Sequence, residues 1–581
     1  MTFEIKGNEF VRDGEPIKLI SGAIHYFRNP HGYWEDVLRR LAAMGCNCVE
    51  TYCAWNLHEP TAGEFNFDGD LNIAEFVRLA GEMGLMVIVR PGPYICAEWE
   101  FGGLPWWLQT EQDMEIRCMN DKYLKYFDRY LDELLARLRP LLCTNGGPIV
   151  MMQIENEYGY YGDDKQYLDH LYNGYLRRGI DVPLFTSDGT DEWNILNGSH
   201  EKCLCTLNFG SMTPDRFDAQ QRIYPNSPKM CAEMWDGWFD HWGGECHATT
   251  DAKVYAEHLD GMLAIGNANI YMFIGGTNFG FMNGANHYEK YEPTVTSYDY
   301  DALLTECGDI TDKYMLCRDV IKKYTGVEPP QIPQNRKKAA YGKVFMTESA
   351  GLLDNLDVLD SAPLSLNVPV PMEDCGQGYG YIAYSTVTRH RLDNRTLRIN
   401  GLGDRAQIYV GNRLVYIMYI NDEKQECCIS AEAGERITVV VENMGRTNFG
   451  EKMMRKKGIA GRVTIGGNIH FNWTAHRLTM KDLSGVRFKQ GAPDCKSAFW
   501  RGSFNADGEC DTFLRTDCFT KGVAFINGFN LGRFWEVGPT KTLYIPKFLL
   551  KNGANELVVF DSDGAKSDAP YVEFTDAPDL G

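Results

Sequence analysis

The sequence predicts a (β/α)₈ barrel followed by two all-β sandwich domains. Residues 1–330 alternate between strand-like and helix-like segments and contain eight strand candidates, the number that such a barrel requires. After this region helical periodicity fades, and short β-rich runs alternate with Gly, Asn and Asp turns. Two parts of this second region also share a pattern at nearly the same spacing. A chain of 581 residues is too long for one hydrophobic core, which supports several domains.

The strand candidates of the barrel are apolar runs short enough to be buried parallel strands. They are Lys18–Tyr26, Asn47–Tyr52, Leu85–Gly92, Ile149–Glu157, Pro183–Asp188, Cys203–Phe209, Lys229–Trp235 and Ala268–Gly275. Amphipathic helices are predicted over Trp34–Met44, Leu71–Met83 and Asp121–Leu138. The first two end at Gly45 and Gly84, and glycine is typical just past a helix C-terminus.

The β-rich region contains a short internal repeat. Ala406–Gly411 and Ala524–Gly528 each read as a strand followed by glycine, and Gly434–Val441 and Gly553–Phe560 each run from a turn into an apolar strand. The offsets between the two pairs agree within one residue. We therefore predict a catalytic barrel at 1–330, a linker at 331–374, and sandwiches at 375–480 and 481–581.

Composition excludes several classes of protein. There are 58 basic and 79 acidic residues, and the net charge of −21 argues against nucleic acid or an anionic membrane as the main partner. No stretch approaches 18 uncharged apolar residues, so no membrane span is expected. The first residues lack a basic segment followed by an apolar run, and we expect a cytoplasmic protein without a signal peptide. A homodimer is compatible with the sequence, which does not specify an oligomeric state.

The 18 cysteines are predicted to be reduced thiols. Most lie inside apolar runs, where cysteine behaves as a small buried hydrophobe. Cys46 and Cys48 form one closely spaced pair and Cys203 and Cys205 another, but neither has a second pair at zinc-finger spacing. We expect no metal, and reduced thiols agree with a cytosolic location.

Residues 146–162 are the most informative segment. A Gly-Gly-Pro turn leads into an apolar strand that ends in Gln153, Glu155, Asn156 and Glu157. Burying two carboxylates and two amides without partners is costly, so a core strand has no structural use for them. Catalytic groups of β/α-barrels lie at the carboxyl ends of the strands. The segment therefore predicts an active site.

A second carboxylate, Glu233, ends the seventh strand candidate, and Glu157 ends the fourth. Strands four and seven face each other across a barrel mouth. A carboxylate pair about 5–5.5 Å apart is the arrangement of retaining glycosidases, with one nucleophile and one acid/base. Strand alternation places Glu155 on the same face as Glu157, so geometry alone leaves open which is the acid. Nearby aromatics suit the faces of a sugar ring: Tyr158, Trp235, Trp238 and Trp242.

The segment Gly146–Tyr158 resembles the signature of family 35 glycoside hydrolases, the β-galactosidases of the large (β/α)₈ glycosidase clan. Other blocks are similar to that family along almost the whole chain. They are Ser21–Arg28, Thr51–Pro60, Arg90–Pro105, Tyr271–Gly280, Thr296–Ala302 and Gly522–Trp535. The resemblance implies a retaining exo-β-galactosidase that removes terminal non-reducing β-galactose from oligosaccharides without a cofactor. It also implies that the last domain resembles galactose-binding jelly rolls.

The resemblance carries roles to individual residues. Glu157 corresponds to the proton donor, Glu233 to the nucleophile, and Asn156 to the asparagine that holds the sugar 2-hydroxyl. A buried acceptor such as Glu98 suits two neighbouring hydroxyls and rejects the wrong epimer. The expected substrate-binding set is Tyr52, Cys96, Ala97, Glu98, Asn156, Trp235, Trp238 and Tyr300.

Trp235 departs from the family, because many relatives have tyrosine there. An indole can only donate a hydrogen bond, whereas a phenol can also accept one. A bulky Trp at this position resembles bacterial intracellular enzymes that prefer particular galactosyl linkages, β-1,3 among them. The departure concerns the aglycone side of the site more than the galactose side.

Several alternatives remain open at this stage. Tyr52 and Tyr300 could be core aromatics, and the tryptophans at 55, 99, 106 and 107 could be packing residues or sugar subsites. His25 and His58 are interpreted as structural. The function could be that of an exo-β-glycosidase for another sugar, such as a glucosaminide, or that of a non-catalytic sugar-binding protein. The second alternative expects a missing carboxylate, and both are present.

Overall fold

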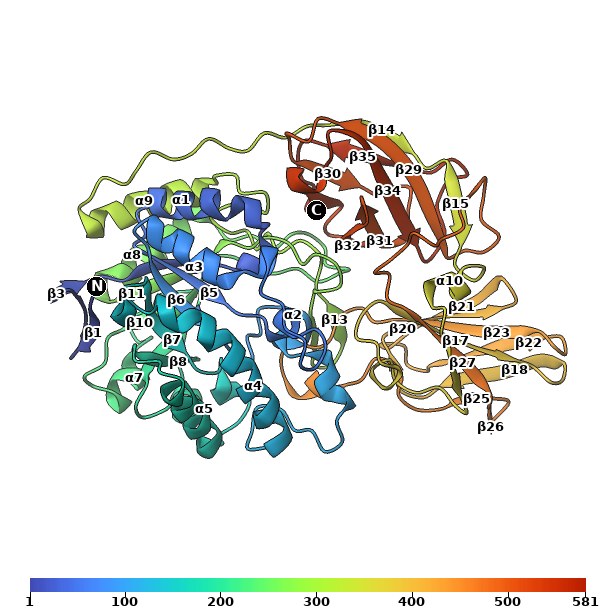
Figure 1. Ribbon diagram of the computed structural model, residues 1–581, viewed down its shortest axis with the longest axis horizontal. Coiled ribbons are helices and arrows are strands. Elements are labelled where there is room, and N and C mark those ends of the chain that lie inside the picture. Colours follow the sequence, from blue (N-terminus) through green and yellow to red (C-terminus); the bar gives the residue numbers. More distant parts are fainter.

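The computed structural model describes residues 1–581 and confirms the predicted fold class, a β/α barrel followed by all-β domains (Figure 1). Eight parallel strands close into a barrel, each hydrogen-bonded to the next in chain order, with the last beside the first. Each lies within one residue of a predicted candidate or inside it. They are β4 (Ile20–Ile24), β5 (Cys48–Tyr52), β6 (Met86–Arg90), β7 (Ile149–Gln153), β8 (Leu184–Asp188), β9 (Leu204–Asn208), β10 (Met230–Trp235) and β11 (Asn267–Ile274).

Helices cover the outside of the barrel (Figure 1). Two have the predicted bounds, α1 (Trp34–Met44) and α4 (Asp121–Leu138), and α3 (Ile73–Glu82) is shorter at both ends than predicted. Gly45 ends α1 with φ 97°, a left-handed conformation that a side chain would disfavour. The other barrel helices are α2 (Trp55–His58), α5 (Lys165–Arg177), α6 (Glu192–Gly198), α7 (Asp218–Ile223), α8 (Ala252–Ile265) and α9 (Asp312–Thr325). None of the helices has the length and apolar character that a membrane crossing requires.

Two short antiparallel features were not predicted. A three-stranded sheet precedes the barrel, formed by β1 (Phe3–Lys6), β2 (Glu9–Arg12) and β3 (Glu15–Ile17). A hairpin follows the last barrel strand, formed by β12 (Ala285–His287) and β13 (Tyr291–Pro293). Strands of three or four residues carry too little periodicity to be recognised from sequence. The first sheet lies with the N-terminus on the side of the barrel away from the β-domains, and β13 lies toward them (Figure 1).

The first sandwich pairs a six-stranded sheet with a four-stranded one. The larger sheet contains β16 (Leu364–Leu366), β27 (Trp473–Leu478), β17 (Tyr381–Val387), β23 (Arg436–Glu442), β20 (Arg405–Val410) and β21 (Arg413–Tyr419). The smaller contains β22 (Glu426–Ala431), β18 (Leu392–Ile399), β25 (Val463–Ile465) and β26 (Asn468–Ile469). A two-stranded ladder, β19 (Leu402–Gly403) with β24 (Gly458–Ile459), lies beside them.

The second sandwich has the same design. Its larger sheet contains β28 (Lys489–Gln490), β15 (Glu348–Gly351), β29 (Ala498–Ala506), β34 (Gly553–Asp561), β31 (Lys521–Ile526) and β32 (Phe529–Trp535). Its smaller sheet contains β14 (Gly342–Phe345), β35 (Tyr571–Thr575), β30 (Thr512–Arg515) and β33 (Thr542–Ile545). The four strands β29-β34-β31-β32 repeat the order of β17-β23-β20-β21, so the repeat read from the sequence is a repeat of sheet order.

The segment 331–374 is more than the linker that the sequence suggested. It contains α10 (Leu356–Leu359) and three strands. Two of them, β14 and β15, pair with β35 and β29 of the second sandwich, whereas β16 pairs with β27 of the first. The second sandwich therefore combines strands that precede the first sandwich in the sequence with strands that follow it.

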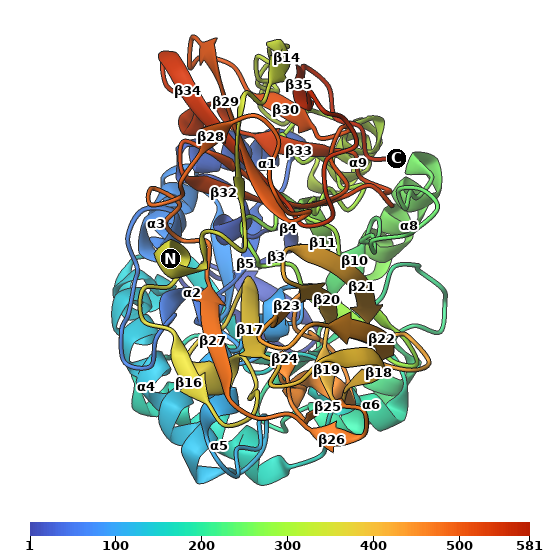
Figure 2. The same ribbon diagram turned by 90° about the vertical axis from the view of Figure 1, so that its right-hand side faces the viewer.

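The two sandwiches share a hydrophobic core. One buried cluster joins Tyr381, Tyr409 and Val440 of the first larger sheet to Phe499 and Phe560 of the second. Burial of apolar surface between the sheets stabilises this contact. Figure 2 shows the second sandwich above the first, with the barrel behind both. The β-domains therefore form one unit on the barrel.

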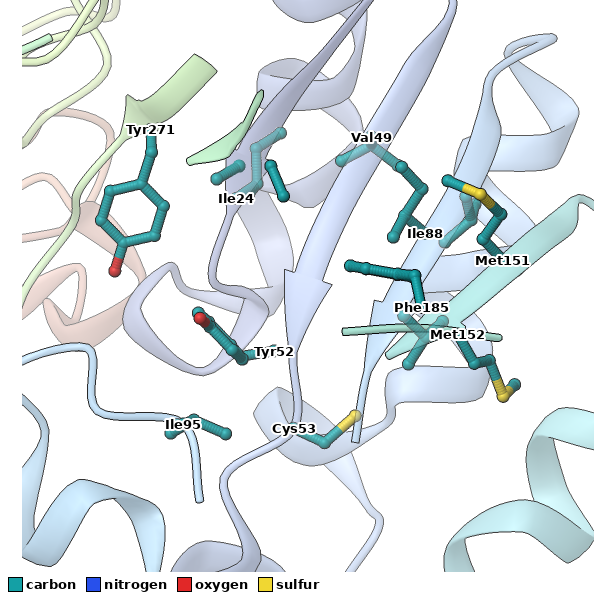
Figure 3. Close-up of a cluster of buried hydrophobic side chains, with 14 of the residues drawn as sticks. Ile24, Val49, Tyr52, Cys53, Ile88, Ile95, Met151, Met152, Phe185 and Tyr271 are labelled. Atoms are coloured by element: carbon teal, nitrogen blue, oxygen red, sulfur yellow. The ribbon is translucent and has the colours of Figure 1, made fainter. Parts of the chain in front are cut away.

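The barrel has its own core of 97 buried residues. Figure 3 shows part of it, with Ile24, Val49, Ile88, Met151 and Phe185 contributed by five neighbouring strands. This core fixes the strands and therefore the positions of the polar groups at their ends. Twelve of the 18 cysteines are buried, and all 18 are free thiols.

Candidate active site

A cavity of about 210 Å³ opens at the carboxyl ends of the barrel strands, and it contains all ten residues that the sequence proposed for the site. These are Tyr52, Cys96, Ala97, Glu98, Asn156, Glu157, Glu233, Trp235, Trp238 and Tyr300. Strand ends β5, β6, β7 and β10 and the segments that follow them supply most of the lining. The barrel closure thus gathers residues that lie up to 248 positions apart, as the motif at 146–162 predicted for the ends of parallel strands.

Glu157 faces the cavity from the segment just after β7. Its backbone is left-handed, with φ 48°, and its N–H donates to the carbonyl of Ser187 at 3.0 Å. Asn208 donates a hydrogen bond from Nδ2 to Glu157 Oε1 at 3.0 Å. Burial first, and the negative charge of Glu233 second, raise the pKa of Glu157 to about 8. A carboxyl group that keeps its proton at neutral pH is suited to act as a general acid.

Glu233 lies near the end of β10 and is 6% exposed. Arg90 Nη2 lies 2.7 Å from Glu233 Oε1, and the Tyr52 hydroxyl donates to the same oxygen at 2.6 Å. Trp235 donates from Nε1 to Oε2 at 3.2 Å. These three donors fix the orientation of the Glu233 carboxylate. An oriented anion is what a nucleophile requires.

Glu155, the alternative acid, is excluded from the cavity. Arg117 binds both of its oxygens, at 2.9 and 2.8 Å, and Tyr167 donates to Oε1 at 2.9 Å. The strand was predicted to continue through Glu157, but β7 ends at Gln153, and Glu155 has φ 60°. The alternation of side chains along a strand therefore does not apply to these two residues. The Glu155 carboxylate lies against Arg117 and Tyr167, whereas the Glu157 carboxylate lines the cavity.

Arg90 organises the floor of the site, and sequence reasoning gave it no role. Its Nη2 donates to Asn156 Oδ1 at 2.6 Å as well as to Glu233, and its guanidinium stacks on the Tyr52 ring at 3.9 Å. Gln153 accepts a hydrogen bond from Arg90 Nε. Because Asn156 Oδ1 is occupied by Arg90, its amide nitrogen is the group left to donate to a ligand. The block 90–105 was recognised in the sequence, but its first residue carried no separate signal.

The segment Cys96–Glu98, which lines the cavity, has an unusual backbone. Cys96, Ala97 and Glu98 are three consecutive left-handed residues, with φ of 53°, 55° and 46°. Tyr298 donates to Glu98 Oε2 at 2.6 Å. Burial raises the pKa of Glu98 to about 7. Strained backbone of this kind occurs where surroundings over-determine it, commonly at ligand sites.

Aromatic residues from distant segments form the rim of the cavity, and sequence reasoning missed several. The missed lining residues are Ile95, Tyr160, Phe239, Tyr271, Asn286, Tyr288 and Phe449. Phe449 comes from the first sandwich, so a β-domain contributes to the cavity. Tyr52 and Tyr271 belong to the buried barrel cluster, where Figure 3 shows both, and they also line the cavity. Tyr52 and Tyr300 thus line the cavity, which decides against a purely core role.

Other aromatic candidates are packing residues. Trp55, Trp99 and Trp107 are buried outside the cavity, and each indole donates to a protein oxygen. The remaining three, Tyr158, Trp106 and Trp242, do not line it either.

Each of the two histidines has a local contact through Nδ1, although His25 Nε2 is buried without a hydrogen-bond partner. His25 Nδ1 bonds Arg28 at 2.6 Å, and His58 Nδ1 bonds the carbonyl of Asn66 at 2.8 Å. Nowhere does the structure place three or more His, Cys, Asp or Glu side chains so that they could hold a metal ion.

Comparisons with known proteins agree with this architecture. A family model described as glycosyl hydrolases family 35 matches residues 9–324. Models described as the first all-beta domain and the galactose-binding domain of beta-galactosidase match residues 369–479 and 497–555. A beta-galactosidase of Xanthomonas manihotis is 42% identical over 554 residues, which are 94% of this chain and 91% of that protein.

Mammalian relatives are similar over nearly the whole chain. The beta-galactosidase of Bos taurus is 39% identical, covering 99% of this chain and 94% of that protein. The beta-galactosidase of Homo sapiens is 38% identical, covering 99% of this chain and 90% of that protein. The resemblance seen in the motifs is thus confirmed over the barrel and both β-domains, and the chain belongs to glycosyl hydrolase family 35.

Proposed function

We propose that this glycoside hydrolase is a retaining exo-β-galactosidase that acts by double displacement. The observation that carries the proposal is the contrast between the two carboxyl groups of one cavity. Glu157 has a pKa raised to about 8, and Glu233 is bound by a guanidinium, a phenol and an indole. A carboxyl group that keeps its proton and an oriented carboxylate are the two groups that hydrolysis by a carboxylate pair needs, and membership of family 35 supports the retaining course. The relatives named beta-galactosidase support galactose as the sugar.

The first chemical step follows from these positions. Glu233 attacks the anomeric carbon while Glu157 transfers its proton to the glycosidic oxygen, so the C–O bond breaks and the aglycone leaves as an alcohol. Asn156 donates from Nδ2 to the sugar 2-hydroxyl, a bond that strengthens as positive charge develops on the ring. In the second step Glu157, now ionised, removes a proton from water, which displaces Glu233 and releases β-galactose.

Exo action and a preference for linkage rest on the shape of the cavity. We place galactose against Glu98 and Tyr300 and the aglycone against the aromatic residues Trp235, Trp238, Tyr288 and Phe449, all of which line the cavity. Trp238 is 46% exposed, so this rim offers aromatic surface to a second sugar. We propose β-1,3-linked galactosides as preferred substrates, which Trp235 supports because it stands where many relatives have tyrosine. A groove open at both ends would suit internal cleavage, whereas this cavity suits one terminal residue.

The proposal is tested by hydrolysis of nitrophenyl glycosides and of galactosyl disaccharides that differ only in linkage. We expect galactosides to exceed glucosides and glucosaminides, and β-1,3 disaccharides to exceed β-1,4 and β-1,6. Proton NMR before mutarotation should show β-galactose as the first product. Initial α-galactose would show inversion, and a glucosaminide as best substrate would replace the proposed sugar.

Two further proposals concern the cell and the assembly. We propose a cytoplasmic location, which the 18 free thiols support. We propose a homodimer as the assembly. Cell fractionation and sedimentation velocity test these two proposals separately.

A further inference from the structure

A loop of the first sandwich reaches the wall of the cavity. It follows β23 and carries Asn448, a fully buried residue, directly before the lining residue Phe449. Asn448 N–H donates to the carbonyl of Ala285 at 3.0 Å, and its own carbonyl accepts from the Tyr94 hydroxyl at 2.7 Å. Ala285 follows the last barrel strand and Tyr94 follows β6. The β-domain backbone is thus bonded to two segments at the barrel mouth.

The side chain of Asn448 continues into the cavity wall. Its Nδ2 donates to Cys96 Sγ at 3.5 Å, and Cys96 Sγ in turn donates to Glu98 Oε1 at 3.9 Å. Burial raises the pKa of the Cys96 thiol, which keeps the hydrogen that this second contact needs. Tyr298 holds the other carboxylate oxygen of Glu98 at 2.6 Å. Glu98 is therefore positioned by the barrel on one side and, through a thiol, by the sandwich on the other.

Asn448 is not placed for stability alone. Its Oδ1 is buried and has no hydrogen-bond partner, which is costly for an amide whose purpose is only to fill a core. The donor end, by contrast, faces a turn of three consecutive left-handed residues that needs support from its surroundings. The loop itself is anchored to the barrel by Arg446, which lies 2.6 Å from Glu100 Oε1 with both side chains fully buried.

We infer that Asn448 is a positioning residue for galactose recognition, which it serves by holding the Cys96–Glu98 turn in its ligand-binding form. The inference rests on the proposed galactosidase activity and adds a dependence of sugar recognition on the first sandwich. Asn448 touches no substrate and acts through Cys96. A barrel without this sandwich would lack one of the two groups that orient Glu98.

The test compares Asn448→Ala, Cys96→Ala and the double variant with the wild type. For each, kcat and KM on nitrophenyl β-galactoside and β-glucoside and inhibition by galactose are measured. We expect Asn448→Ala to lower kcat/KM for the galactoside about tenfold or more, because small misplacements of binding groups are costly. The galactose inhibition constant should rise and the preference for galactose over glucose should fall. The double variant should lose no more than the worse single variant, because both changes break one chain of contacts.

Asn355→Ala is the matched control. Asn355 is 2% exposed, and its amide makes two hydrogen bonds far from the cavity. We expect it to lower the melting temperature without changing galactose inhibition. The inference is overturned if Asn448→Ala also lowers the melting temperature without changing galactose inhibition. It is overturned as well if the losses of kcat/KM caused by Asn448→Ala and Cys96→Ala add in the double variant. Should Asn448→Ala fail to fold, Cys96→Ser must retain the sugar preference that Cys96→Ala loses, and equal behaviour of the two overturns the inference. A wild type inactive on every galactoside would instead refute the proposed function.

Discussion

Glu155 and Glu157 are separated by one residue, yet one is neutralised by Arg117 and the other faces the cavity with a pKa raised to about 8. Both have left-handed backbone, with φ of 60° and 48°. The turn sends one carboxylate behind the barrel mouth and the other into it. The chain thereby places a structural ion pair and a candidate acid within three residues, and substitutions should separate their effects.

Glu157→Gln should affect substrates according to their leaving group. Natural disaccharides need a proton on the departing oxygen, and their kcat/KM should fall about 10²–10⁴-fold, the usual contribution of general acid catalysis. For nitrophenyl galactoside, whose aglycone leaves as a stable anion, kcat/KM should fall far less. Glu155→Gln serves as the comparison. It should lower stability by about 3–5 kcal/mol because it leaves the buried Arg117 without its charged partner. If Glu157→Gln lowered kcat/KM equally for both substrates, a residue other than Glu157 would be the general acid.

The raised pKa of Glu157 predicts how activity depends on pH. As pH rises through about 8, Glu157 loses the proton that the first step needs, and kcat/KM for disaccharides should fall. The measurement is kcat/KM against pH for a disaccharide in wild type and Glu157→Gln. The variant should lack this alkaline decline. If kcat/KM fell at the same pH in the wild type and in Glu157→Gln, the alkaline decline would belong to a group other than Glu157.

The same pKa predicts an effect on stability. Between the ordinary glutamate pKa of about 4.3 and the folded value of about 8, folded Glu157 holds a proton that the unfolded chain has released. The free energy of unfolding therefore falls as pH rises through this window. Glu157→Gln removes this dependence, so its melting temperature should exceed that of the wild type more at pH 8 than at pH 5. A constant difference would contradict the assigned pKa.

Arg90→Gln should weaken the nucleophile. The substitution removes the guanidinium that bonds Glu233 Oε1 and Asn156 Oδ1, and we expect kcat to fall about 100-fold or more, as when an oriented charge is lost from an active site. Single-turnover kinetics should place the loss in formation of the glycosyl-enzyme. Arg39→Gln, on the exposed face of α1 beside Glu35, is the surface control and should change neither kinetics nor stability by a measurable amount. If Arg90→Gln formed the glycosyl-enzyme at the wild-type rate, Arg90 would not support the nucleophile Glu233.

Trp235→Ala should change the ranking among β-1,3, β-1,4 and β-1,6 galactosides. Its indole lines the cavity, contacts Glu233 through Nε1, and packs edge-to-face on Trp238 at 5.5 Å. Nitrophenyl galactoside should be affected less, because its aglycone depends little on this wall. A tryptophan that only packs would lower all substrates together and cost about 3–5 kcal/mol of stability. The linkage panel and the melting temperature, measured together, decide between the two.

Arg446→Met should destabilise the contact between barrel and first sandwich. It leaves Glu100 and Glu373, both buried, without their common cation, and breaking such a pair costs about 3–5 kcal/mol. Urea unfolding of the full chain measures the loss. The double variant with Glu100→Gln should recover part of it, because one buried charge is then removed. No recovery would mean that Arg446 contributes through packing.

The eight barrel strands were predictable because each is a short apolar run that stays buried on both faces. The polar cluster at the end of Ile149–Gln153 was predictable because polar side chains without partners have no place in a hydrophobic core. The choice between Glu155 and Glu157 was not, because a left-handed turn replaces the alternation on which that argument depends. The resemblance supplied the assignment that the residues alone left open.

Contacts between distant segments were the part that sequence could not supply. Arg90 reads as an ordinary strand residue until Glu233 and Asn156 are placed beside it. Phe449 lies in a β-domain whose position on the barrel no periodicity encodes. Strands β14 and β15 lie in a segment of mixed pattern, and their partners are strands far along the chain.

The pairing of β14 with β35 has a consequence for biosynthesis. Gly342 lies opposite Phe574 in that ladder, so the two edges meet only after Phe574 has left the ribosome. The first sandwich, encoded between them, is complete in sequence well before its neighbour. The second sandwich cannot close before that point, and its early strands keep unpaired edges while the intervening residues are made. Loss of the final strand by truncation would therefore leave an open sheet edge prone to aggregation, even though every residue of the barrel cavity is intact.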